Sequence, residues 1–224
     1  MYHAVADPTD DPYRITVSAD RLDRQLRWLR RSGCRGVGVG ALLRARAEGR
    51  AHGLVGLTFD DGYADFTEAA LPVLRRHGCT ATLFVLPGRL GGDNAWDPRG
   101  PRRPLLDEAG LRTAAAAGTE IGSHGLYHVD LTTVGDDLLY EETRRSRDWL
   151  TELCGRAPDG FCYPYGTVDA RVAHAVRTAG YGYGCAIRPP AGLPEPHALA
   201  RTHIGQADGG LRLRAKRLRH RRGW

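Results

Sequence analysis

The chain has 224 residues, 42% of them hydrophobic, which is enough for one domain with a substantial core and excludes a largely disordered protein. It contains no run of about 18 apolar residues, and residues 1–5 lack the pattern of a secretory signal, so we expect a cytoplasmic protein without a membrane span. The formal net charge is +6, but seven basic residues lie within residues 212–222. The rest of the chain is therefore close to neutral, and a broad basic surface is excluded.

Hydrophobic periodicity along the chain predicts alternating strands and helices. Strands are expected at residues 2–5, 53–59, 80–86, 119–122, 160–163, 181–187 and 199–204. Helices are expected from residue 20 onward and at residues 68–77, 107–116, 136–153 and 172–179. The stretch 87–104, rich in glycine and proline, is expected to be a surface loop. This alternation is typical of a single α/β domain with a parallel sheet, either open or closed into a barrel.

The cysteines are odd in number and widely scattered, and none forms a CxxC pair. They are Cys34, Cys79, Cys154, Cys162 and Cys185. This pattern predicts reduced thiols rather than a disulfide framework or a cysteine zinc site.

Acidic and imidazole side chains follow two of the predicted strands. Asp60 and Asp61 come at the end of the run 53–59, and His124 and His128 follow the strand 119–122. Sites of parallel α/β folds assemble at the carboxyl ends of the strands. One carboxylate and two imidazoles leave a coordination position for water, as a catalytic metal site requires, and a second carboxylate beside them supplies a base. The pattern predicts metal-assisted hydrolysis.

Three segments resemble, in order, the motifs of the NodB-type polysaccharide deacetylases, which form carbohydrate esterase family four. They are Thr58-Phe59-Asp60-Asp61-Gly62, Ser123-His124-Gly125-Leu126-Tyr127-His128 and Phe161-Cys162-Tyr163-Pro164-Tyr165-Gly166. The resemblance covers residues 1–205 and implies a single-domain distorted (β/α) barrel of seven or eight parallel strands. We expect a catalytic domain at residues 1–208 and a basic tail at residues 209–224.

The resemblance also implies roles for individual residues. Asp61, His124 and His128 match the ligands of one divalent ion, for which zinc is the first choice and cobalt and nickel are alternatives. Asp60 matches the general base. Tyr165 matches the residue whose backbone N–H helps to hold the oxyanion.

The third motif departs from much of the family, because Cys162 stands where an arginine usually orients the base. Arg201, at the end of the last predicted strand, is the expected substitute, as in a branch of the family that lacks this arginine. His203 is a candidate acid toward the leaving amine, although its frame differs from the usual Leu-x-His motif. Cys162 itself is interpreted as a small buried residue, and His3 as a neighbour of the metal.

These inferences predict a metal-dependent amide hydrolase that removes an N-acetyl group from an amino sugar. The lack of an export signal favours a small cytoplasmic glycoside or biosynthetic intermediate as substrate. A cell-surface or cell-wall polysaccharide is the alternative within this class. A non-catalytic metal-containing module that binds carbohydrate or docks on a surface is the alternative from another class.

Two further features leave alternatives open. Trp96, in its glycine- and proline-rich loop, is either a platform for substrate or a packing residue. The basic tail is interpreted as a solvated helix with Leu211 and Leu218 on one partial apolar edge, and contact with a membrane surface is its alternative. Nucleic acid is not an expected partner, since no aromatic residue lies between the arginines before Trp224.

Overall fold

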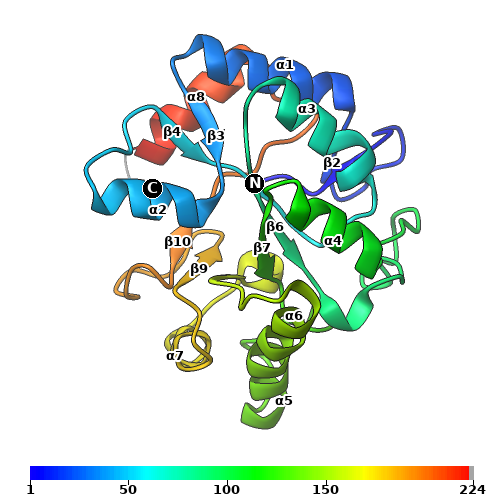
Figure 1. Ribbon diagram of the computed structural model, residues 1–224, viewed down its shortest axis with the longest axis vertical. Coiled ribbons are helices and arrows are strands. Elements are labelled where there is room, and N and C mark those ends of the chain that lie inside the picture. The colour runs from blue at the N-terminus through cyan, green and yellow to red at the C-terminus, as the bar shows by residue number, and fades with distance from the viewer. Residues whose placement is uncertain (222–224) are drawn as a thin grey trace.

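The computed structural model describes residues 1–221, and six of its strands form one parallel sheet (Figure 1). The strands follow the spatial order β10-β9-β8-β7-β6-β5. They are β5 (Thr58–Phe59), β6 (Thr82–Val85), β7 (Glu120–Ser123), β8 (Gly160–Cys162), β9 (Tyr183–Ala186) and β10 (Leu199–Ala200). Each strand lies beside the next one in the sequence, so the sheet is wound in a single direction, as in a (β/α) barrel.

Two parallel pairs of strands continue the wall beyond β5. They are β1 (Ala4–Val5) with β2 (Thr16–Val17), and β3 (Arg35–Val37) with β4 (Leu54–Gly56). A parallel bridge between Tyr2 and Phe59 joins the first pair to β5, and the Leu57 N–H donates to the Val37 carbonyl at 2.8 Å. The wall is therefore parallel throughout but divided into three sheets. This confirms the distorted single-domain barrel expected from the resemblance.

The helices lie outside the strands and surround them (Figure 1). They are α1 (Ala19–Arg31), α2 (Val39–Ala47), α3 (Leu71–Arg76), α4 (Glu108–Ala116), α5 (Asp136–Tyr140), α6 (Ser146–Cys154), α7 (Ala170–Thr178) and α8 (Gly210–Arg221). Short 3₁₀ and π segments complete them: η1 (Phe66–Ala70), η2 (Pro87–Arg89), η3 (Glu141–Arg145) and η4 (Pro164–Gly166). Side chains cap the N-termini of several of these helices. The Ser18 hydroxyl accepts the Arg21 N–H at the start of α1, and Asp107 accepts the Gly110 N–H at the start of α4.

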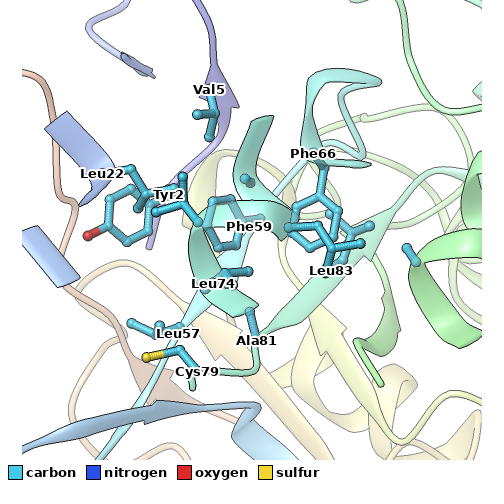
Figure 2. Close-up of a cluster of buried hydrophobic side chains, with 14 of the residues drawn as sticks. Tyr2, Val5, Leu22, Leu57, Phe59, Phe66, Leu74, Cys79, Ala81 and Leu83 are labelled. Atoms are coloured by element: carbon cyan, nitrogen blue, oxygen red, sulfur yellow. The ribbon is translucent and has the colours of Figure 1, made fainter. Parts of the chain in front are cut away.

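The largest apolar cluster packs around β5, the strand that precedes the acidic pair (Figure 2). The Phe59 ring stacks on Tyr2 and meets Phe66 edge-on, each with 5.1 Å between ring centroids. Leu22 of α1 and Leu83 of β6 are fully buried in the same cluster. Burying one such side chain stabilises the fold by about 1.5–3 kcal/mol. The cluster therefore holds β5, and the residues that follow it, in a rigid setting.

The predicted elements differ from the structure in several places. The run expected as one strand at residues 53–59 forms two, because β4 pairs with β3 whereas β5 pairs with β6. The last strand ends at Ala200 rather than at residue 204. Strands β2 and β3 and helix α2 were not predicted. All five cysteines are free, as expected.

The region expected to be a basic tail contains α8, which packs against α1. Its Leu213 side chain is buried. Trp224 lies outside the described residues, and the domain boundary at residue 208 stays a prediction. No helix within residues 1–221 has the length and apolar character needed to cross a membrane.

Candidate active site

The acidic pair sits in a sharp turn directly after β5. Asp61 and Gly62 have φ angles of 70° and 72°, so two successive residues adopt the left-handed conformation. A Cβ on residue 62 would lie 3.0 Å from Val85 Cγ1, which explains the glycine. Asp61 is not a glycine, and its unusual backbone is the kind of strain that persists where the surrounding structure enforces a function.

The two histidines lie on a loop that leaves β7, not on a helix. The His124 N–H donates to the Val85 carbonyl at 2.8 Å, which extends the sheet by one residue. Gly125 and His128 then take φ angles of 83° and 64°. These two left-handed residues fold the loop so that both imidazoles face Asp61. The spacing of four therefore brings the two imidazoles together through a loop.

A buried carboxylate holds this loop from behind. Glu142 Oε2 accepts the backbone N–H groups of Leu126 and Tyr127 at 2.6 and 3.2 Å. Glu142 belongs to the π-helix η3 and is completely buried. A Cβ on Gly125 would lie 2.6 Å from Glu142 Oε2, so glycine is required for this contact. Sequence reasoning did not identify Glu142, because its role depends on a tertiary contact.

The three predicted ligands converge. Asp61 Oδ1 lies 3.3 Å from His124 Nε2 and 3.4 Å from His128 Nε2. Asp61 Oδ1 is buried and has no hydrogen-bond partner in the described part of the chain. The other nitrogen of His124, Nδ1, bonds to the Cys162 carbonyl at 2.7 Å, which leaves Nε2 free to bind an ion. This donor set fits one divalent cation.

Electrostatics favour the charged forms of two of these ligands, Asp61 and His124. Burial alone would raise the pKa of Asp61, but the two imidazoles outweigh it and hold that pKa well below its ordinary value. Burial opposes the charge on His124, yet Cys162 and Asp61 raise the pKa of this imidazole well above its ordinary value. A metal binds neutral imidazole, so ion and proton compete for this site.

Asp60 lines the same cleft as Asp61 and pairs with Arg201. Arg201 Nη1 donates to Asp60 Oδ1 at 2.6 Å and to Thr58 Oγ1 at 3.1 Å, while Nη2 lies 3.0 Å from Cys162 Sγ. Burial would raise the pKa of Asp60, but Arg201, with His3 and His124, lowers it to about 2. Asp60 is therefore a carboxylate at any ordinary pH. The structure places Arg201 where the substitute for the missing arginine was expected, and its role in orienting the base stays a prediction.

A second combination of donors, Asp60, His124 and Cys162, is also close enough to hold an ion. We favour the Asp61 set for two reasons. Arg201 already occupies both Asp60 and Cys162. Burial also raises the pKa of the Cys162 thiol, and only a thiolate is a good ligand.

A cleft of about 250 Å³ opens onto these groups. The Trp96 ring stacks on His128 with 4.6 Å between centroids, and Tyr165 meets the same imidazole edge-on at 4.6 Å. Asp97 lines the cleft, and burial, reinforced by Asp61, raises its pKa to about 6. Trp96 therefore covers a predicted metal ligand rather than packing on a remote surface. A larger hollow of about 440 Å³, beside α5 and α7, contains none of these residues.

The remaining predicted residues differ in whether they line the cleft. His3 and the residue pair Tyr165 and Gly166 line the cleft, whereas His203 is not among the described residues that do so. The His203 ring lies 6.1 Å from the ring of His3. Burial and the neighbouring His3 lower the pKa of His203 to about 4, so the ring is neutral near pH 7. The acid role of His203 and the oxyanion role of Tyr165 stay predictions.

Comparison with known proteins decides the family. The profile described as "Polysaccharide deacetylase" matches residues 48–184, more than half of the chain and the part that carries all three motifs. The chain belongs to the polysaccharide deacetylase family. This makes it a hydrolase of the deacetylase class, which acts on carbon–nitrogen bonds other than peptide bonds, as the sequence predicted.

Similarity to individual members of the deacetylase family is distant but extends over most of the chain. The protein YxkH of Bacillus subtilis (strain 168) is 23% identical over 214 residues, which cover 94% of this chain and 72% of YxkH. The poly-β-1,6-N-acetyl-D-glucosamine N-deacetylase of Staphylococcus aureus (strain N315) is 21% identical over 189 residues, covering 80% of this chain and 63% of that enzyme.

The fold of this deacetylase also matches a solved structure. The Streptococcus pyogenes deacetylase PplD in complex with acetate superposes with a TM-score of 0.80 at 22% identity. The superposition covers 96% of this chain and 95% of PplD. At this identity the comparison supports the barrel fold.

Proposed function

We propose that this deacetylase is a metal-dependent enzyme that removes N-acetyl groups from an amino-sugar polymer of the cell surface. One observation carries the proposal: the convergence of Asp61, His124 and His128 on one point, beside the ionised Asp60. A binding module would need the three ligands but not Asp60, a second buried carboxylate that is held by Arg201. This argues against the non-catalytic alternative.

The residues of the site divide the work of amide hydrolysis. When bound, a divalent ion lowers the pKa of water to about 7 and polarises a carbonyl. Asp60 accepts the proton of the attacking water, and Arg201 keeps this carboxylate ionised and oriented. The backbone N–H of Tyr165 is the proposed donor to the oxyanion, a contribution that is typically about 2.7–4 kcal/mol of barrier. His203 is the proposed acid toward the amine, and this requires its pKa to rise once substrate is bound.

Zinc is the proposed ion. Two imidazoles and one carboxylate form a donor set found at catalytic zinc sites. Imidazole also suits nickel and cobalt, so these remain the alternatives. Measurement of metal content after purification, followed by reconstitution with each ion, distinguishes them.

The comparisons favour a polymer over the small cytoplasmic amino sugar that the sequence placed first. The S. aureus relatives are named for their action on poly-β-1,6-N-acetyl-D-glucosamine. The cleft supports this proposal, because Tyr13, Trp96 and Tyr165 give it aromatic walls on which sugar rings can stack. A surface polymer would also place the enzyme outside the cytoplasm, contrary to the expectation from the sequence. Cell fractionation tests that point.

The decisive experiment measures acetate release from β-1,6-linked N-acetylglucosamine oligomers and from the monosaccharide. We expect the oligomers to be the better substrates. Asp61→Ala should lose both metal and acetate release, whereas Asp60→Asn should keep the metal and lose turnover. Acetate release by metal-free Asp61→Ala protein would refute the metal-dependent mechanism, and a preference for the monosaccharide would refute the polymer.

A further inference from the structure

One side of helix α8 packs against the rest of the domain. Leu213 is buried, and Lys216 Nζ donates to Asp208 Oδ2 at 2.5 Å and to the His203 carbonyl at 2.7 Å. Arg217 Nη1 reaches the Ser32 carbonyl, just beyond the end of α1, at 3.5 Å. Residues 213, 216 and 217 follow the helical repeat, so they define the inward side of α8.

The opposite side of α8 carries two leucines that remain exposed to solvent, one almost completely and one by about half. Leu211 is 87% exposed and Leu218 is 49% exposed. They lie seven residues apart, nearly two helical turns, so they share one side, with Ala215 between them. No other large hydrophobic side chain in the described part of the chain is as exposed as Leu211. Burial in the fold therefore does not explain Leu211, and it covers only about half of Leu218.

Arginines flank this apolar line on both edges. By the helical repeat, Arg214 lies on one edge and Arg212 and Arg219 lie on the other, and Arg212, Arg214 and Arg219 are all exposed. None of the three makes an ion pair with a residue whose side chain the structure describes. Some arginines on other helices are paired with acids, as in Arg112–Glu108, Arg145–Glu141 and Arg171–Asp136. We call the outward side, residues 211, 212, 214, 215, 218 and 219, the α8 ridge.

Neighbouring charges on α1 extend the positive surface. Arg24 and Arg31 are exposed, and neither pairs with an acid within residues 1–221. Figure 1 shows α1 and α8 side by side. The acid that lies beside the start of α8, Asp208, is buried and neutralised by Lys216. The surface around the α8 ridge is therefore cationic.

We propose that the α8 ridge docks on an anionic lipid bilayer. Its arginines would pair with lipid phosphates, and its leucines would enter the apolar layer beneath them. A soluble polyanion such as nucleic acid would be bound by the arginines alone, and exposed leucines would add nothing to that contact. The combination of an apolar centre with arginine on both edges is what selects lipid as the partner. This inference is independent of the metal site.

Vesicle sedimentation with the full chain tests the proposal. We expect binding to phosphatidylcholine vesicles that contain about a quarter phosphatidylglycerol, and little binding to pure phosphatidylcholine. The double variant Leu211→Ser/Leu218→Ser and the triple variant Arg212→Gln/Arg214→Gln/Arg219→Gln should each weaken binding by about tenfold or more. Leu138→Ser on α5, where Leu138 is 41% exposed, and Arg112→Gln on α4 are the matched controls and should bind like the unmodified chain.

Three results would overturn the proposal. The first is an absence of binding to the anionic vesicles. The second is a leucine variant that binds as tightly as the unmodified chain, which would leave a purely ionic surface for polyanions. The third is a change in mass by light scattering between the unmodified chain and the leucine variant, which would make the ridge a contact between two copies. Because the ridge is separate from the site residues, acetate release from soluble oligomers should persist in every variant. A loss of acetate release in these variants would point to a defect in the fold or in the proposed function, and not to the α8 ridge.

Discussion

Arg201 and Asp60, separated by 141 positions in the chain, form a buried ion pair in which Nη1 lies 2.6 Å from Oδ1. The pair joins the first residue after β10 to the first residue after β5, at opposite ends of the six-stranded sheet. The Arg201 guanidinium also contacts Thr58 and Cys162. The Arg201 side chain therefore connects the two edge strands of the sheet and fixes the position of Asp60, the proposed base.

Replacing this arginine should change the pH dependence of the reaction. Arg201 opposes the effect of burial on Asp60, whose pKa is about 2 in its presence. In Arg201→Gln, burial would dominate and the pKa of Asp60 would rise. As the pH is lowered, activity should therefore begin to fall at a higher pH than in the unmodified enzyme. We expect kcat/KM near neutral pH to fall by about 10²-fold or more. The pH profile of kcat/KM checks this, with Arg112→Gln, an exposed arginine on α4 that pairs with Glu108, as a control for the loss of one arginine.

An unchanged acid limb in Arg201→Gln, with full activity, would show that Asp60 does not depend on this arginine. Circular dichroism and the thermal midpoint must first show that the variant folds. Arg201→Lys keeps a positive charge but not the planar fork, so we expect it to shift the acid limb less than Arg201→Gln.

The same carboxylate should contribute to stability in a defined pH window. The folded pKa of Asp60 is about 2 and its ordinary value is 3.8. A lowered acid pKa means that the unfolded chain binds the proton more readily, so the contribution is fully present above pH 3.8 and is lost as the pH falls toward 2. The maximum contribution is about 2 kcal/mol. Urea unfolding between pH 5 and 2, compared with Asp60→Asn, measures this difference, which should shrink toward the acid end.

Glu142 should control metal affinity without touching the metal. Its Oε2 accepts two N–H groups of the loop that carries both histidines. Glu142→Ala leaves both donors without this partner, and the loss at the buried Leu126 N–H costs about 1–3 kcal/mol. Mutation of residues that position metal ligands without binding the metal themselves typically lowers metal affinity by about 10–100-fold. We expect such a loss in Glu142→Ala and partial recovery in Glu142→Gln, which keeps an acceptor oxygen.

Isothermal titration with zinc measures the metal affinity of these variants directly, independently of turnover. Glu141→Gln is the matched control, because Glu141 is the adjacent residue on η3 and pairs with Arg145 at the surface. Equal zinc affinity in Glu142→Ala and Glu141→Gln would mean that the loop holds its shape without the buried carboxylate.

The sequence predicted the alternation of elements, and it singled out the three side chains that converge, Asp61, His124 and His128, because both are recorded in local patterns. Their role as metal ligands stays a prediction. The sequence did not predict β3 and α2, since Gly33, Gly36, Gly38 and Gly40 dilute the apolar pattern there. In the structure, glycine is needed at residues 36 and 38, where a Cβ would meet Leu57 and Glu120 at 2.1 and 2.5 Å. These two glycines allow close packing. An analysis of hydrophobic periodicity interprets such glycines as a sign of irregular structure.

The residues that surround the ligands were harder to predict. Glu142 contacts the loop at residues 126 and 127, and Asp97 lines the cleft near Asp61 and His128, so the residues beside them in the sequence give no signal of these roles. Thr58 was visible within the first motif, but its contact with Arg201 required the geometry of the sheet. Trp96 did give a signal, an aromatic residue in a glycine- and proline-rich loop, although the sequence could not say what it covered.

Trp96 offers a test of how the cleft holds its substrate. Its ring lies parallel to His128, with an interplanar angle of 18°, and lines the cleft. If the ring supports a sugar of the polymer, Trp96→Ala should raise KM for oligomers by about tenfold, with a smaller change for the monosaccharide. Trp96→Phe keeps a stacking face and should restore most of the affinity.

The zinc affinity of Trp96→Ala separates this role from simple packing on His128. A platform for sugar predicts a change in KM with zinc affinity nearly unchanged, since Asp61 and His124 still hold the ion. A packing role predicts the reverse, because His128 would lose the ring that fixes its orientation. Steady-state kinetics on oligomers and zinc titration of the same protein preparation therefore give opposite patterns for the two roles, and a variant unchanged in both would exclude each of them.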